Sequence, residues 1–157
     1  MTHVANLRSA CMEYRIILCP IDITELSDSS IDTAAYLSKL SGARIILLHV
    51  GEDWYRSQPV TTGSREWAAI HKEWLDKGRM LLTNAEARVR ETGVNNVETI
   101  LTEGDPAHEI IAEAKKRRAD LIVMASEHHS RIEKFFIGST TDRVIRNTPC
   151  SVLLINV

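Results

Sequence analysis

Residues 15–21 read Arg-Ile-Ile-Leu-Cys-Pro-Ile, a short and almost continuously apolar run. A strand with one face in water alternates polar and apolar residues, whereas a strand covered on both faces is apolar at nearly every position. The run therefore predicts a buried strand of a parallel sheet. Four later stretches have the same character and predict four further strands: Ala43–Val50, Val97–Thr102, Asp120–Met124 and Ser151–Val157.

Helical periodicity occupies the intervals between these runs. Apolar residues recur at three- and four-residue spacing after Ser27, Asp28, Ser29 and Ser30, which are the N-cap candidates of a first helix that Gly42 ends. A longer stripe predicts a second helix, which Gly78 would weaken locally. The later helices begin at Asp105-Pro106 and at about Ser139, and the long stripe runs from Trp67 to Val89.

Strands and helices thus alternate along the whole chain. Because crossovers between parallel strands are right-handed, this alternation gives a mostly parallel sheet with helices on both faces. The predicted class is a doubly wound α/β domain. The one sizeable irregular stretch is predicted at Gly51–Gly63, where Trp54 and Tyr55 are expected either to cover a crevice or a partner surface or to pack within the loop.

Length, charge and cysteine content restrict the function. The chain has 157 residues, which suits a single domain, and its net charge of −2 argues against nucleic acid and anionic membranes as partners. The longest apolar run, Ile45–Leu48, is too short to cross a bilayer, and the first residues lack the apolar region of a signal peptide. Three widely spaced cysteines (Cys11, Cys19 and Cys150) match no zinc or redox motif and indicate a reducing, cytoplasmic compartment.

No catalytic arrangement is visible in the sequence. Ser126 and Ser130 lack the surrounding glycines of a nucleophile elbow, and Cys19 lies in an apolar strand where a thiol is expected to be inert. The adjacent pair His128-His129 has no third ligand at a metal-binding spacing, so no metal site is predicted. His49 and His108 are expected to be partly buried structural residues.

Six short blocks, in order, are typical of one family: Ile17-Leu-Cys-Pro-Ile-Asp22, Leu47-Leu-His-Val50, Glu103-Gly-Asp-Pro106, Ala119-Asp-Leu-Ile-Val-Met124, Gly138-Ser139 and Asn147-Thr-Pro-Cys150. In these blocks the chain resembles the universal stress proteins. The resemblance covers residues 15–157 and leaves an N-terminal extension at 1–14. It implies a five-stranded parallel sheet of order 3-2-1-4-5, similar to that of the adenine nucleotide alpha hydrolases. A ligand crevice is then expected between the first and fourth strands, at the topological switch point.

The resemblance also implies a ligand, which is ATP or another adenine nucleotide with its accompanying Mg²⁺. The implied cofactor-binding residues are Pro20, Asp22, Val50, Met124, Ala125, His128, Gly138, Ser139, Thr140 and Thr141. Family members that bind nucleotides carry the motif G-x-x-G, nine residues, G-[ST]. Ala125 and His128 stand at its first two glycines, where a Cβ hinders backbone contact with a phosphate.

Each implied role has a structural alternative. Asp22 could serve as a turn or cap residue, Val50 as a core residue, and Ser139 with Asp142 as a helix capping box. Basic residues near the motif could balance phosphate charge or line a solvated helix face: Arg131, Lys134, Arg143 and Arg146.

Two functions remain in consideration. One is a dimeric stress-response module that binds an adenine nucleotide without turning it over, or at most hydrolyses ATP slowly. The other is a dimer of the same family that acts through unidentified protein partners and whose phosphate loop is closed by Ala125 and His128. A small hydrolase has only the hydroxyl cluster and the histidines in its favour.

The final strand suggests how the chain assembles. Ser151–Val157 has no charged side chain and, in the implied order, lies at the edge of the sheet. Unprotected edge strands pair readily with other strands. We therefore expect a homodimer in which two copies of Ser151–Val157 pair across a two-fold axis, as the resemblance also implies.

Overall fold

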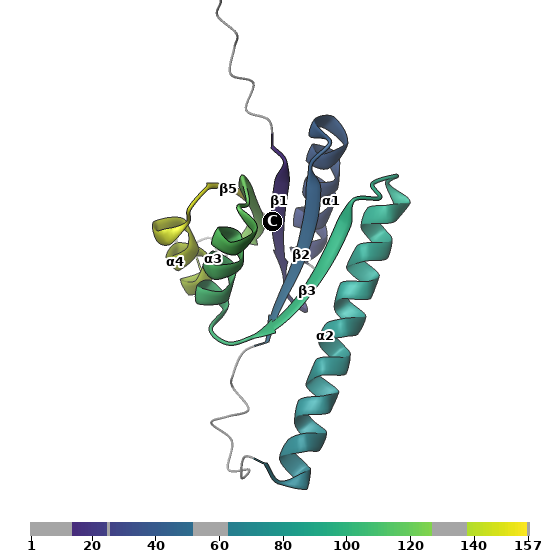
Figure 1. Ribbon diagram of the computed structural model, residues 1–157, viewed down its shortest axis with the longest axis vertical. Coiled ribbons are helices and arrows are strands. Elements are labelled where there is room, and N and C mark those ends of the chain that lie inside the picture. The colour runs from purple at the N-terminus through teal and green to yellow at the C-terminus, as the bar shows by residue number, and fades with distance from the viewer. Residues whose placement is uncertain (1–13, 25, 52–62, 127–137, 157) are drawn as a thin grey trace, which may run out of the picture.

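The computed structural model describes residues 14–24, 26–51, 63–126 and 138–156. Five strands and four helices alternate along the chain (Figure 1). The strands are β1 (Ile16–Ile21), β2 (Arg44–Gly51), β3 (Val97–Glu103), β4 (Leu121–Ser126) and β5 (Ser151–Asn156). The helices are α1 (Leu26–Ser41), α2 (Arg65–Glu91), α3 (Pro106–Arg117) and α4 (Ser139–Asn147). The predicted N-terminal extension and most of the predicted loop at 51–63 lie outside the described residues.

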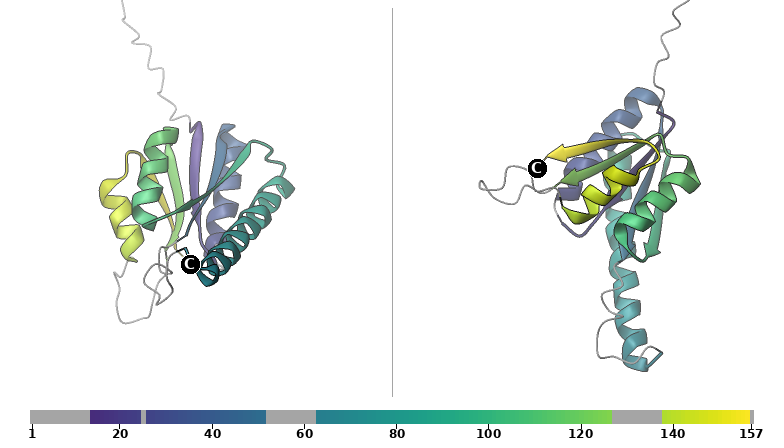
Figure 2. Two further views of the ribbon diagram at one scale, coloured as in Figure 1. Left: turned by 60° about the horizontal axis from the view of Figure 1, so that its bottom comes forward. Right: turned by 90° about the vertical axis from the view of Figure 1, so that its left-hand side faces the viewer.

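All neighbouring strands are parallel, and their order is β3-β2-β1-β4-β5. Helices α1 and α2 cover one face of the sheet and α3 and α4 the other (Figure 2). Successive residues of β1 enter opposite cores, since Ile17 and Cys19 pack with α1 and α2 while Leu18 packs with α3 and α4. The predicted fold class and strand order are confirmed.

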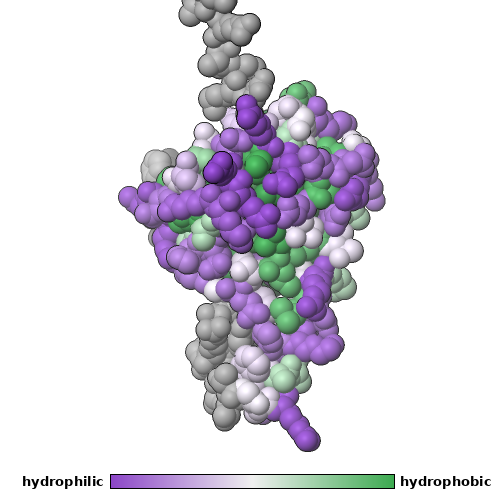
Figure 3. Space-filling model, in the orientation of Figure 1, coloured by the Kyte–Doolittle hydropathy of each residue, from purple (hydrophilic) through white to green (hydrophobic). Residues whose placement is uncertain are grey.

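The sheet is covered unevenly near β3. This strand lies at one edge and is half-buried along most of its length, whereas β2 is buried at most positions. The face seen in Figure 1 is mostly hydrophilic, with hydrophobic residues gathered between α3 and α2 (Figure 3). In the described part of the chain, no helix is long and apolar enough to cross a bilayer.

The start of α1 differs from the sequence prediction. The helix already includes Leu26, so the four N-cap candidates at 27–30 lie inside its first turns. Ser27 and Ser30 are buried, and their hydroxyls bond to Asp22 and to the Ser27 carbonyl oxygen. The chain turns at Asp22, directly after β1, and this sharp turn brings the helix start forward.

Gly78 has a packing role that helix propensity does not reveal. It is buried where α2 crosses the sheet, and a Cβ there would lie 2.8 Å from Leu101 Cδ1 and 3.1 Å from His49 Cδ2. The glycine lets α2 approach β2 and β3 closely. Sequence periodicity cannot reveal this role, because it depends on which side chains the sheet presents to the helix.

A second glycine contact holds α2 against the end of β2. The Trp74 indole packs directly on the Gly51 backbone, and a methyl group on Gly51 would fall inside the ring. Gly51 is not at a positive φ, so the glycine is required by this contact and not by its backbone conformation.

We predict that Gly51→Ala lowers the free energy of unfolding by about 2 kcal/mol, because the indole must move to admit the methyl group. In a Trp74→Ala background the same change should cost no more than about 0.5 kcal/mol, since the obstruction is gone. Denaturant unfolding measures both. Gly138→Ala is the matched control, because a Cβ on Gly138 meets no atom within 4 Å. Equal losses in the two backgrounds would contradict the contact.

Candidate functional site

A crevice opens where β1 and β4 part. The two strands pair only at Ile17 with Leu121 and Leu18 with Ile122, so their carboxyl ends have no register with each other. Beyond these pairs the chain runs from β1 into α1 on one face of the sheet. After β4, the next helix, α4, lies on the other face. This divergence is the physical basis of a switch-point crevice in a doubly wound sheet.

A pocket of about 180 Å³ lies in this crevice. It contains the following predicted site residues: Pro20, Asp22, Val50, Met124, Ala125, Thr140 and Thr141. Further residues that were not predicted as site residues also line it: Ile21, Ser27, Leu48, Pro106 and Ile110. Pro106 and Ile110 come from α3. The sequence marks the start of this helix at Asp105-Pro106, but only the packing of α3 against the sheet brings these two residues to the crevice.

Of the remaining three predicted site residues the structure describes two, and neither lines the pocket. Gly138 and Ser139 stand exposed at the start of α4, next to Thr140. His128 lies outside the described residues. The strand end also differs from expectation, because β4 continues to Ser126, two residues past Met124.

Asp22 is held in a tight turn. Its Oδ1 accepts hydrogen bonds from the Thr24 backbone N–H at 2.9 Å, from the Thr24 hydroxyl, and from the Ser27 hydroxyl at 2.9 Å. Its own N–H donates to Ser27 Oγ at 2.9 Å. Among the described residues, Oδ2 has no hydrogen-bond partner. Asp22 therefore serves the turn through one carboxylate oxygen and presents the other to solvent and the pocket.

The start of α4 is not the predicted capping box. The N-cap is Gly138, with φ −52° and ψ 150°, and no side chain of the described residues caps the helix. Asp142 does not reach back to the helix start, because its carboxylate bonds to Arg146 Nε at 2.8 and 3.0 Å. With respect to the described residues, the N–H groups of Ser139, Thr140 and Thr141 are therefore available to an anion.

The described arginines near the crevice are already paired. Arg143 Nη1 donates to Asp105 Oδ2 at 2.7 Å, and Arg146 pairs with Asp142. Each guanidinium donates a hydrogen bond that holds the pKa of its partner carboxyl below the ordinary value. These contacts favour a structural role for Arg143 and Arg146. Arg131 and Lys134 lie outside the described residues.

The histidine and cysteine predictions have mixed outcomes. His49 is buried, and its Nδ1 lies 2.9 Å from the Ile21 carbonyl oxygen, which is a structural role. His108 was expected to be partly buried but is 73% exposed, because it projects from the first turn of α3. Burial raises the pKa of the Cys19 thiol to about 12, so the thiol stays protonated at neutral pH and is inert. No cluster of metal ligands occurs within the described ranges.

A parallel 3-2-1-4-5 sheet with a crevice at its switch point defines the class of doubly wound α/β domains that bind small ligands between strand ends. The sequence model of the Universal stress protein family matches residues 13–156. The chain belongs to the universal stress protein family.

Individual relatives agree with this assignment. Universal stress protein YxiE of Bacillus subtilis is 33% identical over 148 residues, which cover 88% of this chain and 97% of the relative. The solved structure of UspA from Lactobacillus plantarum has a TM-score of 0.77 at 24% identity, and the match covers 91% of this chain and 98% of that one. A universal stress protein solved in complex with cAMP has a TM-score of 0.72 at 22% identity and covers 91% and 97%.

The turn after β1 yields a prediction about stability. Ser27→Ala should lower the free energy of unfolding by about 1–2 kcal/mol, because it leaves the Asp22 N–H without its partner in a partly buried place. Ser29→Ala is the matched control, because Ser29 lies in the same helix turn and its hydroxyl bonds to no described residue. Thermal or denaturant unfolding measures both variants. Equal effects of the two substitutions would show that the turn does not depend on Ser27.

Proposed function

We propose that the switch-point crevice binds an adenine nucleotide and that the protein is a cytoplasmic stress-response module working by binding, without obligatory turnover. The observation that carries the proposal is the convergence of one apolar wall, one available carboxylate oxygen and one uncapped helix N-terminus on a single pocket. The relative solved with cAMP supports the ligand class. ATP is the first nucleotide to test, with Mg²⁺ accompanying it.

Different residues of the crevice would contact the base, the ribose and the phosphate of the nucleotide. Leu48, Val50 and Met124 would pack against the base, which is flat and largely apolar on its faces. Asp22 Oδ2 would accept a hydrogen bond from a ribose hydroxyl. The N–H groups and hydroxyls at the start of α4 would hold a phosphate, because the helix dipole and the unpaired N–H groups favour an anion there.

The pocket described is smaller than the roughly 300–1,000 Å³ of most small-molecule sites. Ala125 adds a methyl group at its wall, in place of the first motif glycine. His128 takes the place of the second. Both substitutions restrict the approach of a phosphate to the backbone, so we expect weaker binding than a chain with intact glycines would have.

A series of calorimetric titrations with ATP and with cAMP tests the proposal. Combining Ala125→Gly with His128→Gly should raise affinity about tenfold, or about 1.4 kcal/mol, by freeing the backbone for the phosphate. Asp22→Asn should lower affinity by a similar factor, because the amide keeps the Oδ1 acceptor of the turn and replaces Oδ2 with a donor. An unfolding curve for Asp22→Asn serves as the control for folding.

The opposite results identify the alternative function. Unchanged affinity in Asp22→Asn would leave Asp22 as a turn residue only. No binding by the parent chain or the double glycine variant, and no nucleotide released on denaturing the purified protein, would overturn nucleotide binding. The protein would then be the interaction dimer acting through protein partners. The carboxylate pairing of Arg143 and Arg146 favours this second candidate, because each guanidinium already has a counter-charge.

We also propose that the protein forms a homodimer through β5, extending to Val157 at the end of the predicted strand. The strand pairs with β4 on one side only, and its central residues are half-exposed. Val152 and Leu154 pack against one core, and Leu153 and Ile155 against the other. A two-fold pairing of β5 with its copy would bury the remaining apolar surface and satisfy the free edge.

Sedimentation of Leu153→Pro and Leu154→Pro tests the dimer. The N–H groups of consecutive strand residues point to opposite sides, so one variant removes a donor at the free edge and keeps the pairing with β4. That variant should be a folded monomer. Leu153→Ala and Leu154→Ala keep both donors and serve as controls. A parent chain that is monomeric at micromolar concentration, or two folded proline variants that dimerise fully, would overturn the proposal.

A further inference from the structure

A second and larger cavity, of about 520 Å³, lies on the opposite face of the sheet from the crevice. It is bounded by the carboxyl ends of β1 and β2 and by α2. Its origin is a mismatch of lengths. The 27 residues of α2 span about 40 Å, while the eight residues of β2 span about 26 Å. The first half of α2 therefore extends past the end of the sheet (Figure 1).

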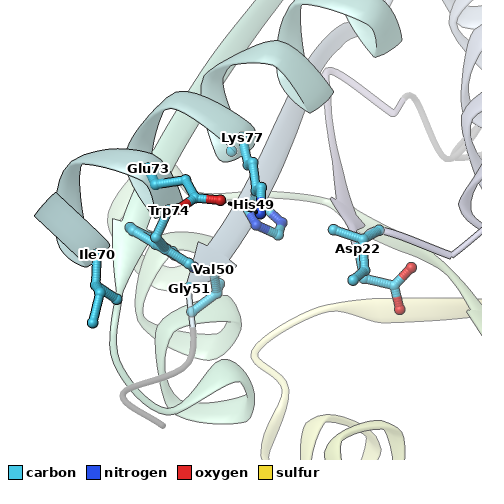
Figure 4. Close-up of a pocket in the computed structure, with 10 residues that line it drawn as sticks. Asp22, His49, Val50, Gly51, Ile70, Glu73, Trp74 and Lys77 are labelled. Carbon is cyan, nitrogen blue, oxygen red and sulfur yellow. Dashed lines mark ion pairs between the residues drawn. The ribbon is translucent and has the colours of Figure 1, made fainter. Parts of the chain in front are cut away.

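The walls of this cavity are mostly apolar. Ile23 and Val50 contribute from the strand ends, and Ile70 and Trp74 contribute from α2. Figure 4 shows Ile70 and Trp74 on α2 beside Val50 at the end of β2, with the His49 ring below the helix near Lys77. The volume is in the range of sites that enclose small molecules, about 300–1,000 Å³.

Aromatic rings make one wall rigid. Trp74 lies nearly parallel to His49, with ring centroids 6.3 Å apart and planes 24° apart. Trp74 is also nearly parallel to His71, with ring centroids 6.2 Å apart, and His71 stacks with Trp67 at 4.9 Å. His71 Nε2 is anchored to Glu103 Oε1 at 2.8 Å. Since Trp74 also rests on the Gly51 backbone, the wall is formed before any ligand arrives.

The charges at this cavity balance. Lys77 Nζ pairs with Glu73 Oε1 at 2.7 Å across one helix turn (Figure 4). The Asp22 carboxylate points away from His49 and Trp74, so Asp22 contributes its aliphatic part to this side. Among the described lining residues, no charge facing the hollow lacks a counter-charge. A charged ligand would have to separate the Glu73–Lys77 pair or stay unpaired in an apolar site, whereas an uncharged ligand has neither cost.

We propose that this cavity is a second binding site, for a small, planar, uncharged aromatic molecule. Flat rings bury large apolar area and stack favourably in offset or edge-to-face contact with the Trp74 and His49 rings. The site is separate from the crevice, since the two lie on opposite faces of the sheet and share only Asp22 and Val50 as lining residues. It does not depend on nucleotide binding by the crevice.

Titration of the ¹⁵N-labelled protein with indole tests the site by nuclear magnetic resonance. We expect saturable shifts of the Gly51 and Gly78 amides and of the Trp74 indole N–H. The amides of Ala125 and Thr140 report on the crevice and should not shift. Absence of saturable shifts up to millimolar indole would overturn the proposal. Shifts at Ala125 and Thr140 without shifts at Gly78 would overturn it too, because the probe would then occupy the crevice.

A matched pair of variants locates the probe independently. Ile70→Trp should fill the cavity and weaken indole binding at least tenfold. Ala69→Trp introduces the same side chain at the adjacent exposed position of α2 and should leave the affinity within twofold. If Ile70→Trp does not fold, Ile70→Ala, which enlarges the cavity and removes a contact, should weaken binding about threefold. Equal affinities in the Ile70 and Ala69 variants would exclude this location.

Charged analogues test the ligand class. Tryptamine and indole-3-acetate carry the same ring with a positive and a negative group, respectively. Both should bind more weakly than indole, because the Glu73–Lys77 pair already neutralises the entrance. Tighter binding of either analogue would overturn the assignment to uncharged ligands.

Discussion

Burial of both faces of a parallel sheet is the constraint on which the rest of this structure depends. Each strand must enter two cores, so β1 and β2 are apolar at almost every position and helices must alternate with strands to cover both sides. The chain reverses the direction of winding between β1 and β4. Because helices then leave to opposite faces, the ends of these strands separate and a crevice forms without any residue being dedicated to opening it.

The crevice and the larger cavity on the side of α2 meet at the end of β2. Val50 lines both, the crevice on the side of α3 and α4 and the larger cavity on the side of α2. The crevice arises from topology and is therefore expected in any chain with this strand order. The larger cavity arises from the length of α2 and from the indole seated on Gly51, which are properties of this particular sequence. The two hollows thus differ in origin as well as in lining.

The phosphate end of the crevice shows how a binding motif changes within a constant fold. The glycine at 138 remains, with a negative φ and with no described atom within 4 Å of where a Cβ would lie, so the described surroundings do not require a glycine there. Ala125 keeps its place in the wall of the pocket, and Arg143 is committed to Asp105, the N-cap of α3. This Arg143–Asp105 pair joins α3 to α4. A residue that resembles a phosphate ligand in sequence is here part of the scaffold.

The sequence by itself determined the fold class, the five strands and the helix at 139–147, because burial leaves continuous apolar runs. Most of the crevice lining followed from the resemblance of the six motif blocks to those of the universal stress proteins. It did not determine the roles of Ser27, Gly78 or Asp142. Ser27 bonds to the turn before α1, Gly78 admits the side chains of β2 and β3, and Asp142 chooses Arg146 over the helix start. Pro106 and Ile110 likewise reach the crevice only because α3 packs beside it. These outcomes depend on which side chains meet across elements or along a helix face, and the tertiary structure decided them.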